Sequence, residues 1–208
     1  MTVPTTVSPI LLWVSDTVSD WFIKKDNYPM LLKIDGQISL RQLQLSDAED
    51  IFHTIDSQRP YLGKWLPFVE QTKDLRDSEE FVRACIDKHE ERLEYTFTIR
   101  KNDVFAGLIG LKDSDSANKK TEIGYWLSEP YQRQGIATQS VRALCDYAFR
   151  KLGFNRVQIK CAVGNDRSRS IPQRLGFQLE GIERQGELLS GNVFADIEIY
   201  SLLKNEFL

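Results

Sequence analysis

Gln132-Arg133-Gln134-Gly135-Ile136-Ala137 is the stretch that decides the fold of this 208-residue chain. It follows a strand-like apolar run over residues 123–127 and opens an amphipathic run over residues 136–152. The first N–H groups of a helix have no acceptor within the helix, and the helix dipole adds partial positive charge there. Gly135 has no Cβ, so an anion can approach the backbone closely. The stretch therefore predicts a site for a phosphorylated cofactor.

The elements around this stretch predict one mixed α/β domain over residues 36–208. Apolar periodicity predicts a first strand, two helices that begin at Ser46 and Asp77, three strands, the helix after the loop, a strand, a short helix and two final strands. This order predicts a central twisted sheet of about seven strands with helices on both faces.

Residues 1–35 differ from the rest and are predicted to be a helical N-terminal extension. Ser8-Pro9 is a good helix start, and apolar residues follow it at spacings of three and four. Such a helix either packs on the domain or serves as a lid or a partner contact.

Composition narrows the function classes. The net charge of −3, from 27 basic and 30 acidic residues, gives no reason to expect nucleic-acid binding. Cys85, Cys145 and Cys161 lie in apolar periodic runs without metal-ligand spacing, which predicts buried thiols in a reducing compartment. No run reaches the ~18 apolar residues of a membrane span, and the start lacks the basic region of a secretion signal. The chain is therefore expected in the cytoplasm, without a membrane or metal partner.

The order Q-x-x-G-x-A between a strand and a helix resembles the acetyl-CoA loop of the GNAT N-acetyltransferases, [QR]-x-x-G-x-[GA]. The P-loop and dinucleotide motifs are absent from the sequence. Further segments follow the order of the RimL-like branch, which acetylates protein N-termini and related amines: 122–127 (Glu-Ile-Gly-Tyr-Trp-Leu), 165–168 (Asn-Asp-Arg-Ser), 175–177, 179–181 and 191–196. The resemblance covers about residues 37–205. It implies the GNAT fold and acetyl transfer from acetyl-CoA to a protein N-terminus or a small amine, with a homodimer plausible.

The resemblance implies which residues bind the cofactor. Asn165 is expected to bond the pantetheine arm, although it also fits an ordinary turn. The backbone N–H near Leu127 is the expected oxyanion donor, where this strand separates from the next and leaves room for the arm to bind like an added strand. The full set runs from the strand end into the helix: Trp126, Leu127, Ser128, Gln132, Arg133, Gln134, Gly135, Ile136, Ala137, Thr138 and Asn165.

A base is needed because a primary amine with a pKa near ~10 is mostly protonated at pH 7. Resemblance to the histone-acetyltransferase branch puts Glu122 in this role, with Glu94 in reserve. Strand alternation places Glu122, Gly124 and Trp126 on one face of the sheet. The alternative is a structural Glu122 paired with a lysine such as Lys120.

The proton donor for the leaving thiolate is predicted less directly. Many GNAT enzymes have a Tyr four residues before the Gly-Phe pair, where this chain has Pro172, expected in the first turn of the short helix. RimL-like enzymes use a Ser at the position of Ser168, whose alternative role is the N-cap of that helix. Pro172 favours a second hypothesis, a non-catalytic CoA-binding sensor or scaffold module, whereas Glu122 and Ser168 oppose it.

The acceptor pocket is predicted from the same resemblance. Tyr61, Trp65 and Phe68 lie where the family builds this pocket, and Asp196 matches a recurrent acidic position in the last strand that would bind the amine. Each aromatic residue fits a core position equally well, and Asp196 also fits a buried structural hydrogen bond.

Overall fold

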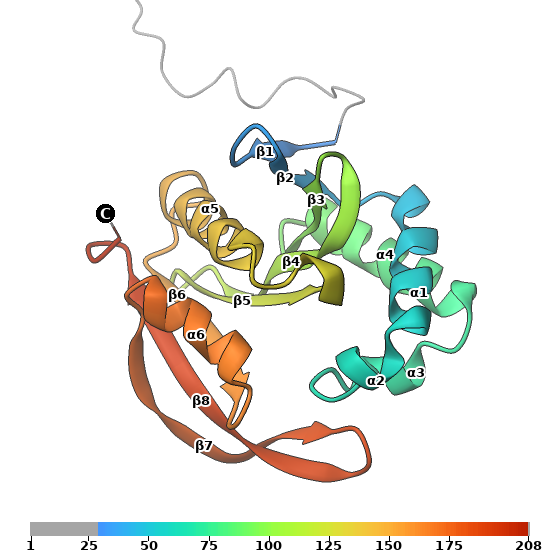
Figure 1. The fold of residues 1–208 in the computed structure, drawn as a ribbon. Helices are drawn as coiled ribbons and strands as arrows, with labels where there is room; N and C mark the ends of the chain where they lie inside the picture. Colours follow the sequence, from blue (N-terminus) through green and yellow to red (C-terminus); the bar gives the residue numbers. More distant parts are fainter. Residues whose placement is uncertain (1–28, 208) are drawn as a thin grey trace, which may run out of the picture.

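A computed structural model describes residues 29–207, which form an eight-stranded sheet with helices packed around it (Figure 1). The strand order is β1-β2-β3-β4-β5-β6-β8-β7. The strands are β1 Leu31–Lys33, β2 Ile38–Gln42, β3 Tyr95–Lys101, β4 Val104–Asp115, β5 Lys120–Leu127, β6 Arg156–Ala162, β7 Gln178–Leu189 and β8 Val193–Leu203. The helices are η2 Leu45–Asp47, α1 Ala48–Ser57, α2 Arg59–Leu62, α3 Phe68–Gln71, α4 Leu75–Glu90, η3 Glu129–Tyr131, α5 Ile136–Arg150 and α6 Asp166–Arg174.

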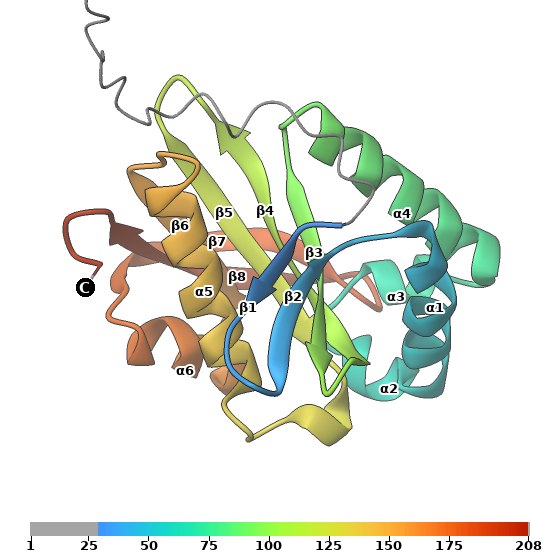
Figure 2. The ribbon, with the colours of Figure 1, turned by 90° about the horizontal axis from the view of Figure 1, so that it is seen from above.

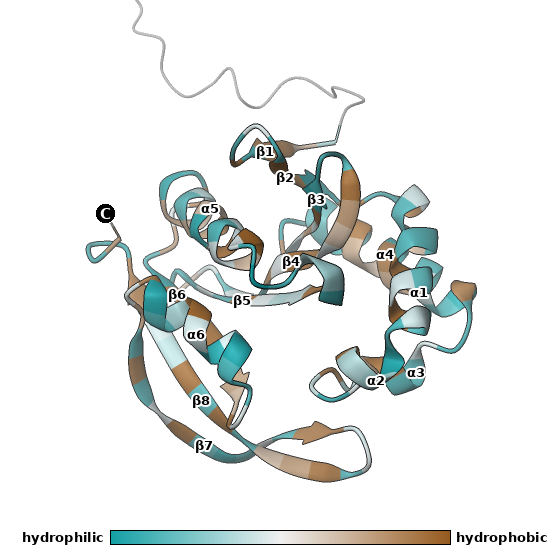
Figure 3. Cartoon of the chain, viewed as in Figure 1, coloured by the Kyte–Doolittle hydropathy of each residue, from teal (hydrophilic) through white to brown (hydrophobic). Residues whose placement is uncertain are grey.

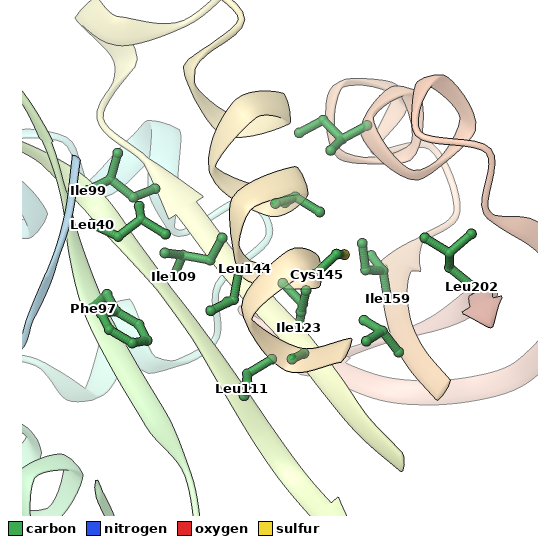
Figure 4. Packing of buried hydrophobic residues seen from close by; sticks show 14 of the residues in the cluster. Leu40, Phe97, Ile99, Ile109, Leu111, Ile123, Leu144, Cys145, Ile159 and Leu202 are labelled. Carbon is green, nitrogen blue, oxygen red and sulfur yellow. The ribbon is translucent and has the colours of Figure 1, made fainter. Parts of the chain in front are cut away.

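Helix α5 lies across one face of the sheet (Figures 1 and 2). Val141, Leu144, Cys145 and Ala148 recur at spacings of three and four residues, and each is 0% exposed. This spacing forms one apolar stripe on a helix, and the stripe faces the strands. It packs against alternate strand side chains in the main core, including Phe97, Ile109, Ile123 and Ile159 (Figure 4).

A second core cluster lies on the opposite face of the sheet, where α1 and α4 cover the same strands. Ile51 of α1 and Val82 of α4 meet Leu108 of β4 and Trp126 of β5 in this cluster. Trp126 and Ile123 therefore belong to different faces of β5, as strand alternation predicts. The predicted mixed α/β architecture with helices on both faces is confirmed, and the sheet has eight strands rather than about seven.

The β7–β8 hairpin behaves differently from the rest of the sheet. Its long strands curve away below β5 and contain stretches of hydrophobic residues (Figures 1 and 3). Leu188, Val193 and Phe194 are 44%, 58% and 59% exposed. The C-terminal part of β8 pairs with β6 and contributes Tyr200 and Leu202 to the main core, whereas the tip of the hairpin is held by β7–β8 pairing, which two register shifts interrupt.

The boundary predicted at residue 35 falls inside the sheet. Residues 31–33, assigned from the sequence to the extension, form the edge strand β1, which pairs antiparallel with β2. A strand of three residues is too short to show alternation, so the sequence pattern could not reveal it. The helix predicted after Ser8 lies outside the described residues.

Two predicted helix caps are displaced: the 3-10 turn η2 already begins at Leu45, ahead of α1, and α4 begins at Leu75. Asp47, expected inside a capping box that starts at Ser46, instead accepts the N–H of Gln44 at 2.9 Å and pairs with Arg41 and Arg100. Asp74 rather than Asp77 is the N-cap of α4, because its carboxylate accepts the N–H of Arg76 at 2.8 Å. Asp47 and Asp74 both accept backbone N–H groups at a helix start. The sequence therefore predicts the right kind of cap but places it at the wrong residue.

The three cysteines are buried and free, as predicted. Among residues 29–207, helices are too short or too polar to cross a membrane.

Candidate active site

The loop before α5 adopts the backbone of an anion cradle. Gly135 is the N-cap of α5 and has a left-handed φ of 74°. The first helical hydrogen bond runs from the N–H of Gln139 to the carbonyl of Gly135 at 3.0 Å. The N–H groups of Ile136, Ala137 and Thr138 precede that bond and so have no acceptor within the helix. These three donors and the positive end of the helix dipole fit a diphosphate.

Side chains from distant elements hold the start of this loop. Arg167 of α6 donates to the Gln132 side-chain oxygen at 2.6 Å, and the Gln132 amide donates to the Tyr61 hydroxyl. Tyr61 in turn donates to the carbonyl of Leu127 at 3.3 Å, the last residue of β5. Burial raises the pKa of Tyr61, although the charge of Arg167 opposes the shift. Tyr61, predicted in the acceptor pocket, thus lies at the cofactor loop.

Ser128 is fixed at the turn between β5 and the loop. It is buried, its N–H donates to the carbonyl of Ala106 at 2.8 Å, and its Oγ accepts the Gln58 amide at 2.9 Å. Gln58 also accepts the N–H of Glu129 at 2.9 Å. Further along, Lys101 contacts the Gln134 side chain, while Arg133 stays exposed with a left-handed φ of 58°.

Strands β5 and β6 separate next to this loop. They pair in parallel at only three positions, which end at Glu122 opposite Gln158. Residues 123–127 of β5 therefore have no β6 partner, and the split that opens beside them leads toward the first turn of α6. An extended arm fits such a split because it can use strand groups left without a partner.

Helix α6 brings two predicted residues to the split. Asn165 is the N-cap, and its Oδ1 accepts the N–H of Ser168 at 3.2 Å. The alternative prediction of Ser168 as N-cap is therefore wrong, because the longer Asn165 side chain takes that role from three residues earlier. Ser168 Oγ instead lies 3.1 Å from the hydroxyl of Tyr125 and 3.4 Å from Sγ of Cys161. Pro172 lies in the last turn of α6, not the first.

A cleft of about 880 Å³ opens on the face of the sheet opposite α5. Its walls come from α1, α4, the segment between α2 and α3, the central strands, α6 and the β7 strand. Trp65, Phe68, Trp126, Asn165 and Ser168 line it. The cleft thus connects the strand split with an aromatic wall.

Glu122 lies in the floor of this cleft and is 6% exposed. Its carboxylate lies 2.9 Å from Nζ of Lys112 and 3.6 Å from Nζ of Lys160, and it accepts the Gln158 amide at 3.3 Å. The lysine partners are therefore these two and not Lys120, whose Nζ lies 3.9 Å from Asp115. Burial would lower the pKa of Lys112, but its hydrogen bond to Glu122 and that group's charge outweigh burial and raise it.

Other carboxylates around the cleft were not singled out by the sequence. Glu187 of β7, Asp77 and Glu80 of α4 line it together with Glu94, the reserve base. Glu94 is paired with Lys88 at 3.0 Å. Glu187 is exposed and lines the cleft because the hairpin extends toward α3, where the N–H of Gly191 donates to Glu70 at 3.1 Å. The position of Glu187 in an alternating strand does not signal this.

Comparison with known proteins identifies the family. The family model described as acetyltransferase (GNAT) domain matches residues 37–178, more than half of the chain. The chain belongs to the GNAT acetyltransferase family. Its predicted acetyl-CoA-dependent N-acetyltransferase activity and its resemblance to the RimL-like branch are confirmed, and the non-catalytic alternative is not supported.

Relatives of this GNAT enzyme include acetyltransferases named for ribosomal proteins. It is 36% identical over 182 residues to the putative ribosomal N-acetyltransferase YdaF of Bacillus subtilis (strain 168), covering 84% of this chain and 96% of that one. It is 30% identical over 173 residues to the ribosomal-protein-serine acetyltransferase of Escherichia coli (strain K12), covering 82% and 94%.

Solved GNAT structures match the fold closely. The ribosomal L7/L12 alpha-N-protein acetyltransferase RimL in complex with coenzyme A superposes with a TM-score of 0.81 at 26% identity, covering 84% of this chain and 98% of that one. The microcin C7 self-immunity acetyltransferase MccE, in complex with acetyl-CoA and AMP, gives a TM-score of 0.78 at 28% identity, covering 83% and 95%. Acetyl-CoA is the cofactor of the family, and the bare amides ahead of Gln139 fit its diphosphate.

Besides Tyr61, a second residue predicted for the acceptor pocket of this GNAT enzyme lies away from the cleft. Asp196 of β8 is exposed and is not among the cleft-lining residues of the described chain. Its carboxylate accepts the N–H of Gln185 across the hairpin at 2.8 Å. The structural hydrogen bond of the alternative prediction is therefore present, although at an exposed rather than a buried site.

Proposed function

We propose that this enzyme acetylates the N-terminal α-amine of a protein, with a ribosomal protein as the favoured class of acceptor. The observation that carries the proposal is the open cleft of about 880 Å³, which meets the strand split beside Ser168 and Asn165. A cleft of this size accommodates several residues of an extended peptide. The named activities of the Bacillus subtilis and Escherichia coli relatives support the same class of acceptor.

The chemistry of the cleft lining supports a cationic, partly apolar acceptor. Trp65, Phe68 and Phe81 offer apolar contacts, and the last two are 37% and 44% exposed. Glu80 and Glu187 add negative charge to the lining. A protonated peptide N-terminus with apolar residues behind it complements both features.

Different residues of the chain bind the cofactor, polarise the acetyl carbonyl and transfer protons in the proposed reaction. Acetyl-CoA supplies an acetyl group activated as a thioester. In this proposal the amides of Ile136–Thr138 bind its diphosphate, Asn165 orients the arm, and the N–H of Leu127 polarises the acetyl carbonyl. Glu122 accepts the proton that the acceptor amine loses, and Ser168 donates a proton to the departing sulfur.

A small polyamine is the second candidate acceptor, favoured by the acidic lining. The chain is 26% identical over 147 residues to the spermidine N(1)-acetyltransferase of Escherichia coli (strain K12), covering 69% of this chain. A polyamine needs negative charge but does not use the aromatic wall, so the two acceptors respond differently to changes in that wall.

An acceptor panel tests the proposal. Release of CoA is followed with a thiol reagent for N-terminal peptides of ribosomal proteins, for the same peptides with a blocked N-terminus and an internal lysine, and for spermidine. Mass spectrometry then locates the acetyl group. We expect turnover of the free N-terminal peptides, weakened by Trp65→Ala and Phe81→Ala. Faster turnover of spermidine than of every peptide, with no effect of either variant, would contradict it.

The predicted cytoplasmic location and homodimer remain predictions for this chain. Fractionation of cells that produce a tagged chain tests the first. Light scattering during size-exclusion chromatography, with and without residues 1–28, tests the second.

A further inference from the structure

The Tyr125 side chain joins β5 to α6 across the split, and the proposed reaction gives it no role. Its hydroxyl donates to the carbonyl oxygen of Ser168 at 3.1 Å and lies 3.1 Å from Oγ of the same residue. Tyr125 and Ser168 both line the cleft. Two contacts from one hydroxyl to one serine restrict that serine more than packing alone does.

Pro172 explains why this carbonyl is available. In an α-helix the N–H of residue 172 would donate to the carbonyl of residue 168. Proline has no N–H, so the carbonyl of Ser168 lacks its helical donor. The hydroxyl of Tyr125 supplies the missing donor from a neighbouring strand. Pro172 thus occupies the helix position where many GNAT enzymes have a Tyr. It also leaves the Ser168 carbonyl as an acceptor for Tyr125 of β5.

Tyr125 and Ser168 each have one hydroxyl proton, and this decides which hydroxyl donates and which accepts in each contact. Tyr125 has one proton and gives it to the Ser168 carbonyl, so its oxygen can only accept from Ser168 Oγ. Burial raises the pKa of Tyr125, so the phenol keeps its proton at neutral pH. On the other side of Ser168, burial raises the pKa of Cys161 to about 11, so this thiol also stays neutral. The Ser168 proton, which points to the Tyr125 oxygen in this arrangement, is therefore the one that can be redirected to a departing sulfur, while both neighbours stay neutral.

We propose that Tyr125 is a positioning residue for acetyl transfer, which clamps Ser168 through the carbonyl left free by Pro172 and directs the serine hydroxyl to the strand split. The proposal rests on the proton-donor role proposed above for Ser168. In the step that it serves, the Ser168 O–H bond breaks, an S–H bond forms on the departing thiol, and the serine recovers a proton from solvent. Tyr125 keeps its own proton throughout.

A double-mutant cycle tests the clamp. Tyr125→Phe removes one oxygen and keeps the ring, Ser168→Ala removes the proposed donor, and the third variant combines both. We expect Tyr125→Phe to lower kcat about tenfold, as the loss of one well-placed hydrogen bond does, with KM for acetyl-CoA within about twofold of wild type. Ser168→Ala alone should lower kcat at least as much, and the double variant should be no slower than Ser168→Ala. Tyr147→Phe, at a partly buried tyrosine of α5 that packs against the core outside the cleft lining, is the matched control and should keep wild-type kcat.

The other possible results contradict the clamp, the proton-donor role of Ser168, or both. If Ser168→Ala keeps wild-type kcat, the proposed donor role fails and the clamp fails with it. If only Ser168→Ala slows turnover, the donor role stands and the clamp is wrong. The clamp is also wrong if the fold-losses in kcat of Tyr125→Phe and Ser168→Ala multiply in the double variant. It is equally wrong if Tyr125→Phe changes only KM for acetyl-CoA.

Pro172→Ala provides a second test of the clamp in case Tyr125→Phe does not fold. The new N–H of residue 172 competes with Tyr125 for the Ser168 carbonyl, so kcat should fall about threefold while thermal stability is kept or gained. An unchanged kcat in this folded variant would count against the clamp.

Discussion

The cofactor loop and the acceptor cleft are built in opposite ways. The loop uses backbone groups that are close in sequence, namely the left-handed Gly135 and the amides of the next three residues. The cleft uses side chains from six or more elements, and its central carboxylate, Glu122, depends on lysines from β4 and β6. A backbone site is fixed once its helix forms, whereas a side-chain site depends on the whole sheet. Changes should therefore act on binding at the loop and on turnover in the cleft.

The largest effect is expected in the cleft, from Glu122→Gln. Loss of a positioned base should lower kcat/KM about 100-fold at pH 7, with partial recovery at high pH as the acceptor amine deprotonates without help. The measurement is a pH–rate profile from pH 6 to 10. Glu187→Gln, which removes the exposed carboxylate on the other side of the cleft, is the matched control. A larger loss for Glu187→Gln, or an unchanged profile for Glu122→Gln, would move the base to Glu187.

At the loop, Gly135→Ala should weaken acetyl-CoA binding about tenfold, because a Cβ enters the cradle and a left-handed φ strains the new residue by about 1–2 kcal/mol. Gly153→Ala is a close control, since Gly153 has a φ of 76° against 74° at Gly135 but lies past the far end of α5. Calorimetry with CoA should show weaker binding for Gly135→Ala alone, with similar loss of thermal stability in both. Equal affinity in the two variants would remove the loop from the cofactor site.

A smaller effect is expected where the two regions meet, at Arg167. Arg167→Ala breaks the contact with Gln132, so KM for acetyl-CoA should rise about threefold, as expected for a partly exposed polar contact, while kcat stays constant. Arg174→Ala, at the other end of α6, should change neither value. A fall in kcat without a change in KM would show that Arg167 serves the cleft instead.

The smallest effect concerns the helix wall of the cleft. Asp77 accepts the N–H groups of Lys73 and Asp74 at 2.6 and 3.0 Å, and these bonds lower its pKa below that of an ordinary aspartate. A depressed folded-state pKa adds stability above the unfolded value, and that stability is lost as the pH falls through the folded value. Asp77→Asn should therefore lower the Tm slightly at pH 7 and by less near pH 3, while Glu79→Gln should not show this pattern. A Tm difference that is independent of pH would contradict this account.

The loop could be predicted from the sequence because its information is local. Glycine at the helix cap, the strand before it and the stripe after it all lie within about thirty residues, so periodicity and backbone rules suffice. The face of β5 that carries Trp126 followed in the same way from alternation. Neither prediction required knowing which strands pair with each other in the sheet.

The cleft could not be predicted to the same degree, because its partners are far apart in sequence. Lys112 meets Glu122 through the β4–β5 register and Lys160 meets it from across the parallel pair, whereas the sequence suggested the adjacent Lys120. Asp196 matched a family position, yet the curvature of the hairpin turns it toward Gln185 and away from the cleft. The role proposed for Tyr125 required knowing that its hydroxyl reaches the α6 carbonyl that Pro172 leaves without a helical donor.

The two lysines beside Glu122 have a further consequence. They are primary amines inside a chamber whose chemistry is the acylation of primary amines, and only the neutral form of an amine attacks a thioester. By holding Lys112 in its ammonium form, the carboxylate keeps a nucleophile of the enzyme itself out of competition with the incoming substrate. The same ion cluster that shapes the floor of the cleft thus keeps Lys112 from being acetylated by its own enzyme.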